Sequence, residues 1–595
     1  METTTRPSSD NRENRPGWIE YPVERLVDPS PAALRELALE YTPAVLRTSH
    51  GSLNKVSRNK ARMAKYTFVI TDEPKGWSHG TIPVDEARVL IAAQAAYIER
   101  RGRLIEVRGW LGVGPRAVPV QWLYTLEGAN IAAMQRILAF PRERVEADPS
   151  GPFEPRFRVV YTPDFRPDID GGQRILVDLE NRVTYIMGPD YFGESKKAAL
   201  RMLCDDVYGQ GGLVLHAGAK EVLLDGQRLT VAILGLSGTG KTTTTFSRQG
   251  EGVRPVQDDM VALWPEGELS VTENGCFAKT FGLTDDSEPV IHAGSTSPDA
   301  WLENAYQDDR GEVDFSKTVL EPHEVAALRE VLLATGADAD HLEAYIDGEV
   351  TAAQVIDEHL VPEDGWDFVV WTANGRSIIP LARIEDAADL DDLAPVRSMG
   401  ILNRDEGQGA ITPGIVRFVS PEQAAGYFML GETSKTSAAG KERGKTRSPF
   451  TQPFFPREHG LQARRFAEIL ATTPDLTTWM MNTGFVGGDA REVDQKALKV
   501  KIRHSSAMLE ALFKGSVVWE RDPDFGYEVV AVDDPRNADL LQHVPADVLR
   551  PDKMYARQGR MDVYRAEVAE RHAERRAFLE KHGVDPAIVA AVTGG

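Results

Sequence analysis

One motif constrains this chain more than any other feature: a short apolar stretch followed at once by a glycine-rich loop. Residues 231–245 read VAILGLSGTGKTTTT. Val231 to Leu234 predict a buried β-strand, and Gly235 to Thr242 match G-x-x-x-x-G-K-[ST], the P-loop pattern. Because a strand precedes the motif and a threonine-rich helix start follows it, a chance match in a glycine-rich turn is the weaker interpretation.

The residue types of the motif suit phosphate chemistry. Glycines let successive backbone N–H groups turn toward a phosphate chain, and the helix that follows adds the positive end of its dipole. Lys241 supplies a cation to the outer phosphates, and the Thr242 hydroxyl suits a magnesium ion. We therefore expect phosphate contacts from Gly235, Ser237, Gly238, Thr239, Gly240, Lys241, Thr242 and Thr243.

A pair of carboxylates, Asp258 and Asp259, follows the predicted helix. The order strand, P-loop, helix, strand, acid is typical of a metal-binding carboxylate, although an isolated Asp-Asp pair is usually a turn. His216, inside the apolar stretch 213–220, has no such context. Taken alone, it is more often a core histidine than a ligand, and the adjacent Lys196 and Lys197 are more often a solvated helix start.

Composition excludes several classes of function. A chain of 595 residues holds two or three domains or lobes, and 68 Lys and Arg against 90 Asp and Glu give a net charge of −22. That charge argues against a general nucleic-acid or membrane-surface binder. With only two cysteines, a disulfide framework is not expected, and a cytoplasmic location fits. No apolar run reaches membrane-spanning length, and residues 1–17 predict a disordered tail without a signal-peptide core.

Alternating strand and helix patterns predict an α/β protein with an N-terminal lobe over 18–212 and a C-terminal nucleotide-binding lobe over 213–595. Residues 175–180 and 183–187 predict a hairpin, and 496–515 predict a helix. The basic stretch 49–66 is compatible with either an anion contact or a solvated loop.

Two further segments stand out by composition. Residues 318–370 carry thirteen Asp and Glu against the single Arg329, which predicts an inserted acidic helical subdomain. Its charge fits a solvated face, a protein partner or an oligomer contact better than catalysis. Residues 431–449, rich in Gly, Ser, Thr, Lys and Arg, have the composition of a lid loop over phosphates.

Read together, these motifs resemble the ATP-dependent phosphoenolpyruvate carboxykinases. The resemblance runs in order from about Tyr161 to about Asn537, through TYIMGPDYFGESKKAALRMLC, VLHAGA, GLSGTGKTT, the Asp258-Asp259 pair, ENGCFAKT, SEPVI, WLENAYQDDRGEVDF, NGRSIIP, GKERG, MMNTGFVGG, DPDFGY and DDPRN. The GKERG loop and the form of the P-loop resemble the ATP branch of the family.

The resemblance implies roles that spacing alone does not assign. Lys197, as a neutral amine, His216 and Asp259 match ligands of a transition metal, usually manganese, while Thr242 matches the magnesium ligand and Asp258 its water shell. The remaining matches are Lys241 and Lys279 at the β- and γ-phosphates, Glu288 at the ribose, Arg443 at the nucleotide, Arg376 at the transferred phosphoryl group, and Tyr191 and Ser237 facing the organic acid.

The resemblance thus implies a carboxykinase-like fold that uses ATP, Mg²⁺ and Mn²⁺. The implied reaction is decarboxylation and phosphorylation of oxaloacetate to phosphoenolpyruvate, a step of gluconeogenesis. It implies small-molecule substrates, with no nucleic-acid or membrane partner.

Two departures bear on the acid substrate. The family motif G-R-S-P-K-D-K-[YF], whose arginine grips the substrate carboxylate, is replaced before Tyr66 by SRNKARMAK, which leaves Arg58 and Arg62 as candidates, neither at the family spacing without a gap. After Arg443 the family's T-E-P-T is replaced by TRSP. A divergent ATP-dependent kinase acting on another acid is therefore the alternative, and a regulatory nucleotide-binding protein without turnover is a weaker one.

Overall fold

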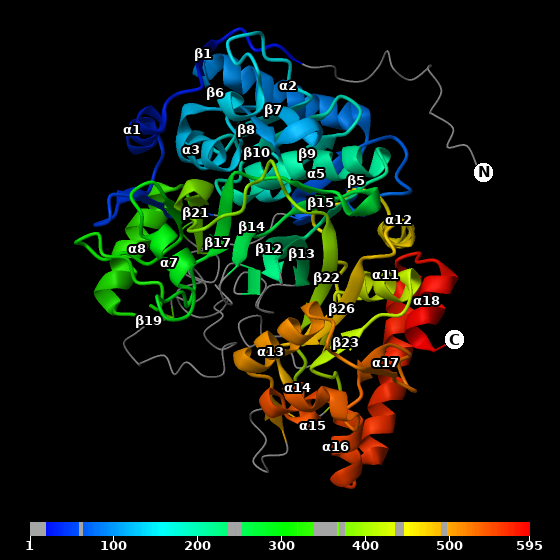
Figure 1. The fold of residues 1–595 in the computed structure, drawn as a ribbon. Coiled ribbons are helices and arrows are strands. Elements are labelled where there is room, and N and C mark those ends of the chain that lie inside the picture. The colour runs from blue at the N-terminus through cyan, green and yellow to red at the C-terminus, as the bar shows by residue number, and fades with distance from the viewer. Residues whose placement is uncertain are drawn as a thin grey trace.

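Two eight-stranded sheets dominate the protein, and the elements that follow the first sheet in sequence build the second body below it in Figure 1. The computed structural model describes residues 19–58, 64–224, 226–235, 244–245, 252–317, 319–337, 339, 366–367, 375–407, 409–434, 445–488 and 497–594. The predicted tail, most of the P-loop, residues 435–444 of the predicted lid and most of 338–374 lie outside these ranges.

The first sheet has the strand order β1-β6-β7-β8-β10-β9-β4-β5. Its strands are β1 (Glu24–Val27), β4 (Thr67–Ile70), β5 (Gly80–Ile82), β6 (Arg103–Leu111), β7 (Val118–Tyr124), β8 (Phe157–Thr162), β9 (Arg174–Asp178) and β10 (Val183–Met187). β9 and β10 pair antiparallel with Val183 opposite Asp178, so the predicted hairpin is confirmed.

Helices cover both faces of this sheet because successive strand residues point to opposite sides. Leu104 and Leu123 pack with α2 (Val84–Arg101) on one face. Ile105 follows Leu104 in β6, and Trp122 precedes Leu123 in β7. Both pack on the other face with α1 (Pro31–Tyr41), α3 (Ala129–Leu138) and α5 (Gly193–Gly209). The short α4 (Arg142–Val145) follows α3.

The second sheet has the order β14-β12-β13-β22-β26-β23-β30-β29, and β13, β22 and β26 are parallel neighbours. Its strands are β12 (Ala217–Leu224), β13 (Gln227–Gly235), β14 (Val253–Gln257), β22 (Val396–Asn403), β23 (Ile415–Arg417), β26 (Thr477–Asn482), β29 (Trp519–Arg521) and β30 (Glu528–Val530). β13 is the strand that the P-loop motif predicts.

Helices also cover both faces of the second sheet. One face packs with α11 (Pro421–Leu430), α12 (Gly460–Ala471), α17 (Met561–Lys581) and α18 (Pro586–Thr593). The other packs with α13 (Ile502–Phe513), α14 (Ala538–His543), α15 (Ala546–Leu549) and α16 (Pro551–Arg557). The predicted helix over 496–515 begins only at Ile502, because Leu498–Lys499 instead form strand β28, which pairs with β27 (Phe485–Val486).

A five-stranded sheet joins the two halves of the sequence in the order β17-β21-β18-β3-β2. Its strands are β2 (Val45–Arg47), β3 (Leu53–Lys55), β17 (Gly275–Lys279), β18 (Trp301–Glu303) and β21 (Arg376–Pro380). β3 belongs to the basic stretch 49–66, and Lys55 within it is 1% exposed. The solvated-loop interpretation is therefore wrong for this part of the stretch, because the strand is buried beside β18.

The described part of the acidic insert is docked against the basic stretch. Helix α8 (Pro322–Ala334) buries Leu332 against Val56 and Leu320. Arg58 and Arg166 donate to the carbonyl oxygens of Thr335 and Gly336 at the end of the helix, where its dipole attracts cations.

The smaller elements complete the described structure. A three-stranded sheet contains β11 (Leu213–Leu215), β15 (Val261–Leu263) and β16 (Leu269–Val271), and α7 spans Pro289–Ser295. Two short pairs join β19 (Val319–Leu320) to β20 (Trp366–Asp367), and β24 (Thr433–Ser434) to β25 (Lys445–Thr446). Within the described ranges, no helix is both long and apolar enough to cross a bilayer.

A close approach at Gly400 makes the second sheet sensitive to one methyl group. Trp479 of β26 lies opposite Gly400 of β22, and a Cβ at Gly400 would overlap the indole ring. The indole Nε1 donates to Ser398 Oγ at 2.8 Å, which holds the ring in place.

We therefore expect Gly400→Ala to destabilise the protein by about 1–3 kcal/mol through overpacking. Differential scanning calorimetry measures this as a lower thermal midpoint. Gly209→Ala is the matched control, because a Cβ at Gly209 meets no atom within 4 Å. An unchanged midpoint for Gly400→Ala would contradict this account of the packing.

Candidate functional site

The predicted phosphate loop starts at the carboxyl edge of the second sheet. β13 ends at Gly235, opposite Leu402 of β22, and β22 ends at Asn403, opposite Asn482 of β26. Crevices at the carboxyl ends of parallel strands are where α/β sheets bind ligands. Among the predicted site residues, Ser237, Gly238, Thr239, Gly240, Lys241, Thr242, Thr243, Arg443 and Arg62 lie outside the described residues.

A buried lysine, Lys220, contacts the start of the helix that follows the predicted loop. Lys220 of β12 donates from Nζ to the carbonyl oxygen of Thr244 at 2.8 Å. Burial lowers the pKa of Lys220 to about 8. This contact fixes the position of Thr244, and the sequence pattern does not single Lys220 out.

His216 and Asp259 meet as the sequence predicts for two metal ligands. His216 lies between β11 and β12, and Asp259 lies between β14 and β15. His216 Nε2 is 2.8 Å from Asp259 Oδ1, and its Nδ1 is 3.1 Å from the carbonyl oxygen of Phe450. A carbonyl can only accept, so Nδ1 carries a proton.

This tautomer decides what the site can hold. In a neutral imidazole protonated at Nδ1, Nε2 presents a lone pair, which here faces a carboxylate oxygen. Two electron-rich atoms in contact require a proton or a cation between them. A histidine whose other N–H donates to a backbone carbonyl is the usual arrangement of a metal-ligating histidine, so the pair fits a divalent transition metal.

The charges around this pair also favour a cation. Lys196 Nζ is 2.7 Å from Asp259 Oδ2 and 3.0 Å from Glu273 Oε2, and Asp258 is buried beside them. Burial alone would lower the pKa of Lys196, but these carboxylates raise it, so Lys196 is an ammonium. Three acidic side chains against one ammonium leave a surplus of negative charge, which a metal ion would neutralise.

Lys197, the predicted amine ligand, points elsewhere. Its Nζ contacts Glu194, whose carboxylate also accepts from Arg201 Nη2 at 3.1 Å. Burial alone would raise the pKa of Glu194, but Lys197 and Arg201 lower it to about 2. Adjacent residues of a helix face different directions, which explains why Lys196 and not Lys197 reaches Asp259 in this arrangement.

Within the described ranges, His, Cys, Asp and Glu form no cluster of three or more around one point. Among the described residues, the predicted metal ligands that meet are therefore His216 and Asp259, and the third ligand that the resemblance implies is an amine. Lys197 stays a prediction for that role. Glu273 is the neighbour that sequence reasoning missed, although it lies inside a quoted motif. The interpretation of Lys196 as part of a solvated helix start is wrong, because its side chain is 3% exposed.

The predicted phosphate residues Lys279 and Arg376 are brought together by strand pairing. Lys279 of β17 lies directly opposite Arg376 of β21. The Arg376 guanidinium is 5.4 Å from the Phe277 ring centre, and Lys196 Nζ is 4.8 Å from the same ring centre. Phe277 therefore connects the Lys279–Arg376 pair to the Asp259 cluster, which consists of Asp259, His216, Lys196 and Glu273. Glu288, the predicted ribose contact, is the residue before α7.

Tyr191 is 3% exposed and lies two residues before α5, next in sequence to Asp190 of a second buried ion pair. Lys55 Nζ is 3.3 Å from Asp190 Oδ2, which also accepts from the Arg58 backbone N at 2.9 Å. The Arg58 guanidinium donates to the carbonyl oxygens of Gly188 at 2.6 Å, Pro163 at 3.4 Å and Thr335. In this arrangement Arg58 holds backbone segments together.

Glu303 is the buried acid of this region. It is fully buried at the end of β18, opposite Arg376, and its Oε1 accepts from the Phe192 backbone N at 3.0 Å. Among the described residues, its Oε2 has no hydrogen-bond partner. Burial raises the pKa of Glu303 to about 8, with Asp190 adding to the increase while the Phe192 amide, Lys55 and Arg376 oppose it.

A family model described as phosphoenolpyruvate carboxykinase matches residues 24–329 and 359–534. The interruption, 330–358, lies inside the predicted acidic insert.

Individual relatives cover much of the chain at modest identity. "Phosphoenolpyruvate carboxykinase (ATP)" of Geobacillus thermodenitrificans is 27% identical over 83% of this chain and 80% of its own length. The proteins of the same name from Thermus thermophilus and Parvibaculum lavamentivorans are 28% and 25% identical, over 71% and 94% of this chain and 68% and 93% of their own lengths.

A metal-binding measurement tests the His216–Asp259 pair. We expect His216→Ala and Asp259→Asn each to weaken Mn²⁺ binding by at least about tenfold, because the first removes the imidazole nitrogen and the second replaces a charged carboxylate with a neutral amide. Electron paramagnetic resonance of free Mn²⁺ gives the dissociation constants. Asp562→Asn, at an exposed position of α17, is the control, and unchanged Mn²⁺ affinity in both variants would remove the pair from the metal site.

The pKa of Glu303 predicts a pH dependence of stability. A glutamate in the unfolded chain ionises near its ordinary pKa of 4.5, whereas folded Glu303 keeps its proton up to about pH 8. The folded state therefore binds the extra proton between these values, and the free energy of unfolding falls with rising pH, by up to about 1.4 kcal/mol per pH unit.

Glu303→Gln should remove this slope. The expected result is a thermal midpoint that falls less between pH 5 and pH 8 than in the unmodified protein. Glu312→Gln, at an exposed position, should leave the slope unchanged. Parallel pH profiles for Glu303→Gln and the unmodified protein would contradict the assignment of a buried neutral acid.

Proposed function

Because the chain belongs to the phosphoenolpyruvate carboxykinase family, we propose that it converts oxaloacetate and ATP to phosphoenolpyruvate, CO₂ and ADP. The observation that carries the proposal is the Asp259 cluster. The Asp259 carboxylate contacts both His216 and Lys196. Lys196 and Arg376, the latter a member of the Lys279–Arg376 pair, contact the same Phe277 ring. A metal-binding acid and a phosphate-binding cation pair are what the two halves of this reaction need.

The reaction has two steps whose atoms balance. The bond between the carboxylate carbon and C3 of oxaloacetate breaks, CO₂ leaves, and the electron pair forms the enolate of pyruvate. The enolate oxygen then attacks the γ-phosphorus of ATP, and the bond to ADP breaks. His216 and Asp259, with Lys197 as the proposed third ligand, would hold a divalent ion, which would supply Lewis-acid stabilisation of the developing negative charge.

The chain's own cations handle the phosphoryl group. Lys279 and Arg376, with Lys241 of the P-loop, neutralise charge that spreads over the migrating phosphoryl oxygens. Lys196 holds Asp259 in place through an ion pair, in which the Lys196 side chain is 3% exposed and the Asp259 side chain 18%. Mg²⁺ on the nucleotide, bound by Thr242 with Asp258 nearby, and Mn²⁺ at His216 and Asp259 are the metals we propose.

We extend the proposal to the remaining predicted contacts. Glu288 binds the ribose, Arg443 the nucleotide, and Tyr191 and Ser237 the organic acid. The boundary between the two proposed lobes lies in the sequence near residue 212. Strands β2 and β3, from the first lobe, complete the five-stranded sheet.

One observation supports a second candidate function, an ATP-dependent kinase for a different acid. Arg58, a candidate for gripping the substrate carboxylate, has its guanidinium engaged by backbone carbonyls, and Lys55 nearby is paired with Asp190. A substrate carboxylate must then be bound by Arg62 or by another cation. The nucleotide half of the mechanism is the same for both candidates.

Formation of phosphoenolpyruvate from oxaloacetate, ATP, Mg²⁺ and Mn²⁺ by the purified protein tests the proposal. Arg376→Ala should lower kcat by about 10²–10³-fold, because it removes charge stabilisation in the transition state. Arg383→Ala, which removes an exposed arginine paired with Asp299, should leave kcat unchanged. ATP binding without product from oxaloacetate would favour the second candidate, and full activity of Arg376→Ala would contradict the assigned role.

A further inference from the structure

Two arginines of the first lobe donate hydrogen bonds to the carboxyl-terminal end of helix α8. Arg58 Nη1 donates to the carbonyl oxygen of Thr335 at 2.5 Å, and Arg166 Nη2 donates to the carbonyl oxygen of Gly336. The carbonyls of a last helical turn have no donors within the helix, so a cation at this position has an ordinary structural use. The other partners of Arg58 indicate that it does more than this.

The Arg58 guanidinium binds neutral groups. Besides Thr335, its partners are the carbonyl oxygens of Gly188 at 2.6 Å and Pro163 at 3.4 Å, and no carboxylate among the described residues pairs with it. Asp190 contacts only its backbone N. A guanidinium binds a carboxylate more strongly than a carbonyl, because two parallel hydrogen bonds add to the attraction between opposite charges. Arg58 therefore has an unused capacity for an anionic ligand.

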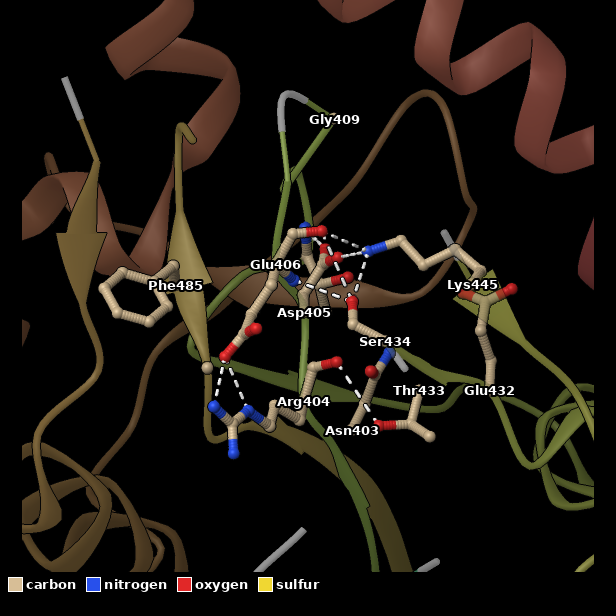
Figure 2. Close-up of polar contacts among 12 residues, drawn as sticks. Asn403, Arg404, Asp405, Glu406, Gly409, Glu432, Thr433, Ser434, Lys445 and Phe485 are labelled. Carbon is tan, nitrogen blue, oxygen red and sulfur yellow. Dashed lines mark hydrogen bonds and ion pairs between the residues drawn. The ribbon is translucent and has the colours of Figure 1, made fainter. Parts of the chain in front are cut away.

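The buried arginines that support the fold, in contrast, are paired with carboxylates. Three such pairs are Arg201 with Glu194, Arg571 with Asp405 and Arg575 with Glu432. Figure 2 shows the surroundings of Asp405, whose carboxylate also accepts from Lys445. Charges that are removed from water in this way neutralise one another, since an unpaired buried charge is costly. The half-buried Arg58 departs from this pattern.

The position of Arg58 fits a ligand that reacts at the five-stranded sheet. Four charged residues occupy directly opposed positions of neighbouring strands and form one row across this sheet: Lys279, Arg376, Glu303 and Lys55. Lys55 is paired with Asp190, which also accepts from the Arg58 backbone N at 2.9 Å. Arg58 thus lies next to one end of a row whose other end is the proposed phosphate-binding pair.

A small apolar contact holds α8 against this part of the first lobe. Leu332 of α8 is fully buried and packs with Leu320 and with Val56, which lies two residues before Arg58. The next residue of the helix, Leu333, is 43% exposed and belongs to no such contact. Segments that are held by few buried apolar contacts open at a low cost in free energy. The end of α8 can therefore give way to a ligand that binds Arg58 more strongly.

The two guanidiniums flank the backbone at Gly336. A Cβ at this glycine would lie 3.0 Å from Arg166 Nη2 and 4.0 Å from Arg58 Nη1. Two cations thus face a short piece of chain whose carbonyl groups carry no net charge. With α8 displaced, the same two guanidiniums would present their donors to a small organic acid, and an acid with two carboxylates could contact both.

We propose that the end of α8 is a specificity-determining element of the acid site, which occupies Arg58 until the carboxylate of a small organic acid displaces it. The inference rests on the proposed function, since it takes Arg58 as the residue that binds the carboxylate of oxaloacetate. Leu332, Thr335 and Gly336 lie between residues 329 and 359, where the family match is interrupted. Displacement of α8 returns Arg58 to a role that another cation would otherwise have to fill.

This competition has a definite sign. Because Arg58 cannot bind α8 and an acid at the same time, the apparent dissociation constant of the acid exceeds the intrinsic one by the reciprocal of the undocked fraction. Weaker docking of α8 must therefore tighten the binding of the acid. A purely structural contact predicts the reverse, since its loss would disturb the site.

The first experiment measures how well α8 covers Arg58. Phenylglyoxal labels accessible arginines, and peptide mass spectrometry of the full-length protein gives the labelling rate of Arg58. We expect Leu332→Ala to raise this rate at least about threefold, because it removes the buried side chain that docks the helix. Leu333→Ala, the same substitution at the exposed neighbour, should match the unmodified protein. An unchanged rate in folded Leu332→Ala would overturn the proposal.

Steady-state kinetics then test the competition with the acid. Leu332→Ala should lower the KM for oxaloacetate at least about threefold, while kcat and the KM for ATP change by less than about twofold. Leu333→Ala should change none of these values. An unchanged or raised KM for oxaloacetate in folded Leu332→Ala contradicts the proposed competition.

Gly336→Ala perturbs the same contact without opening the apolar cluster, and it decides the question if Leu332→Ala does not fold. Gly336 has φ +76°, which strains an alanine, and the added Cβ would crowd Arg166. Gly583→Ala is the matched control, because Gly583 has φ +65° and a Cβ there meets no atom within 4 Å. We expect only Gly336→Ala to lower the KM for oxaloacetate, and equal values in both variants would count against the role of α8.

A double-mutant cycle tests whether the effect passes through Arg58. In an Arg58→Gln background, Leu332→Ala should no longer improve the KM for oxaloacetate, and an equal improvement with and without Arg58 would contradict the proposed route. Labelling separates this inference from the proposed function. Faster labelling of Arg58 with protection by oxaloacetate, but no phosphoenolpyruvate, would contradict only the reaction. Formation of phosphoenolpyruvate with a KM that Leu332→Ala does not lower would contradict only the role of α8.

Discussion

The rest of the site depends on how the charge of Asp259 is shared. One oxygen faces the Nε2 of His216, the other faces the ammonium of Lys196, and that ammonium also lies 3.0 Å from Glu273 Oε2. Burial raises the pKa of Glu273 to about 7, and Asp259 and Asp258 add to the increase against the opposing effect of Lys196. Removing these groups from water is costly, and their mutual neutralisation is incomplete without a cation. In the proposed function, a divalent ion at this pair would complete the charge balance.

The fold brings this cluster to the phosphate residues through strand pairing. Parallel strands deliver Gly235 and Asn403 to one edge of the second sheet, while the five-stranded sheet sets Lys279 against Arg376. The same small sheet draws Lys55 from the first lobe to within two strands of Arg376. Residues more than 200 positions apart in the sequence thus lie in one small sheet. The stretch predicted to bind the organic acid is where this chain departs from the family motif.

The elements predicted correctly are those whose formation depends on short-range sequence patterns. The β9–β10 hairpin and the strand before the P-loop follow from apolar residues bounded by turn residues, and both are confirmed. The meeting of His216 with Asp259 was expected from a family resemblance, and no periodicity would have predicted it. The helix start at Ile502 was missed because a short strand precedes it, and its pairing with β27 depends on tertiary context.

Other features could not be read from the sequence because they depend on long-range pairing. Lys55 lies in a basic stretch typical of solvent exposure, yet its strand pairs with β18, some 250 residues away, and the side chain is buried against Asp190. Arg571 and Arg575 look like ordinary residues of a charged helix until Asp405 and Glu432 are placed beside them. In both cases the decisive partner is distant in sequence, and charge patterning carries no information about it.

The most direct measurement is a crystal structure with Mn²⁺ and Mg·ATP, using anomalous scattering at the manganese edge. We expect an anomalous peak between His216 Nε2 and the Asp259 carboxylate, with the imidazole Nδ1 still donating to the Phe450 carbonyl oxygen. A manganese ion bound elsewhere, with His216 and Asp259 still in direct hydrogen-bond contact, would contradict the assignment of this pair as the metal core.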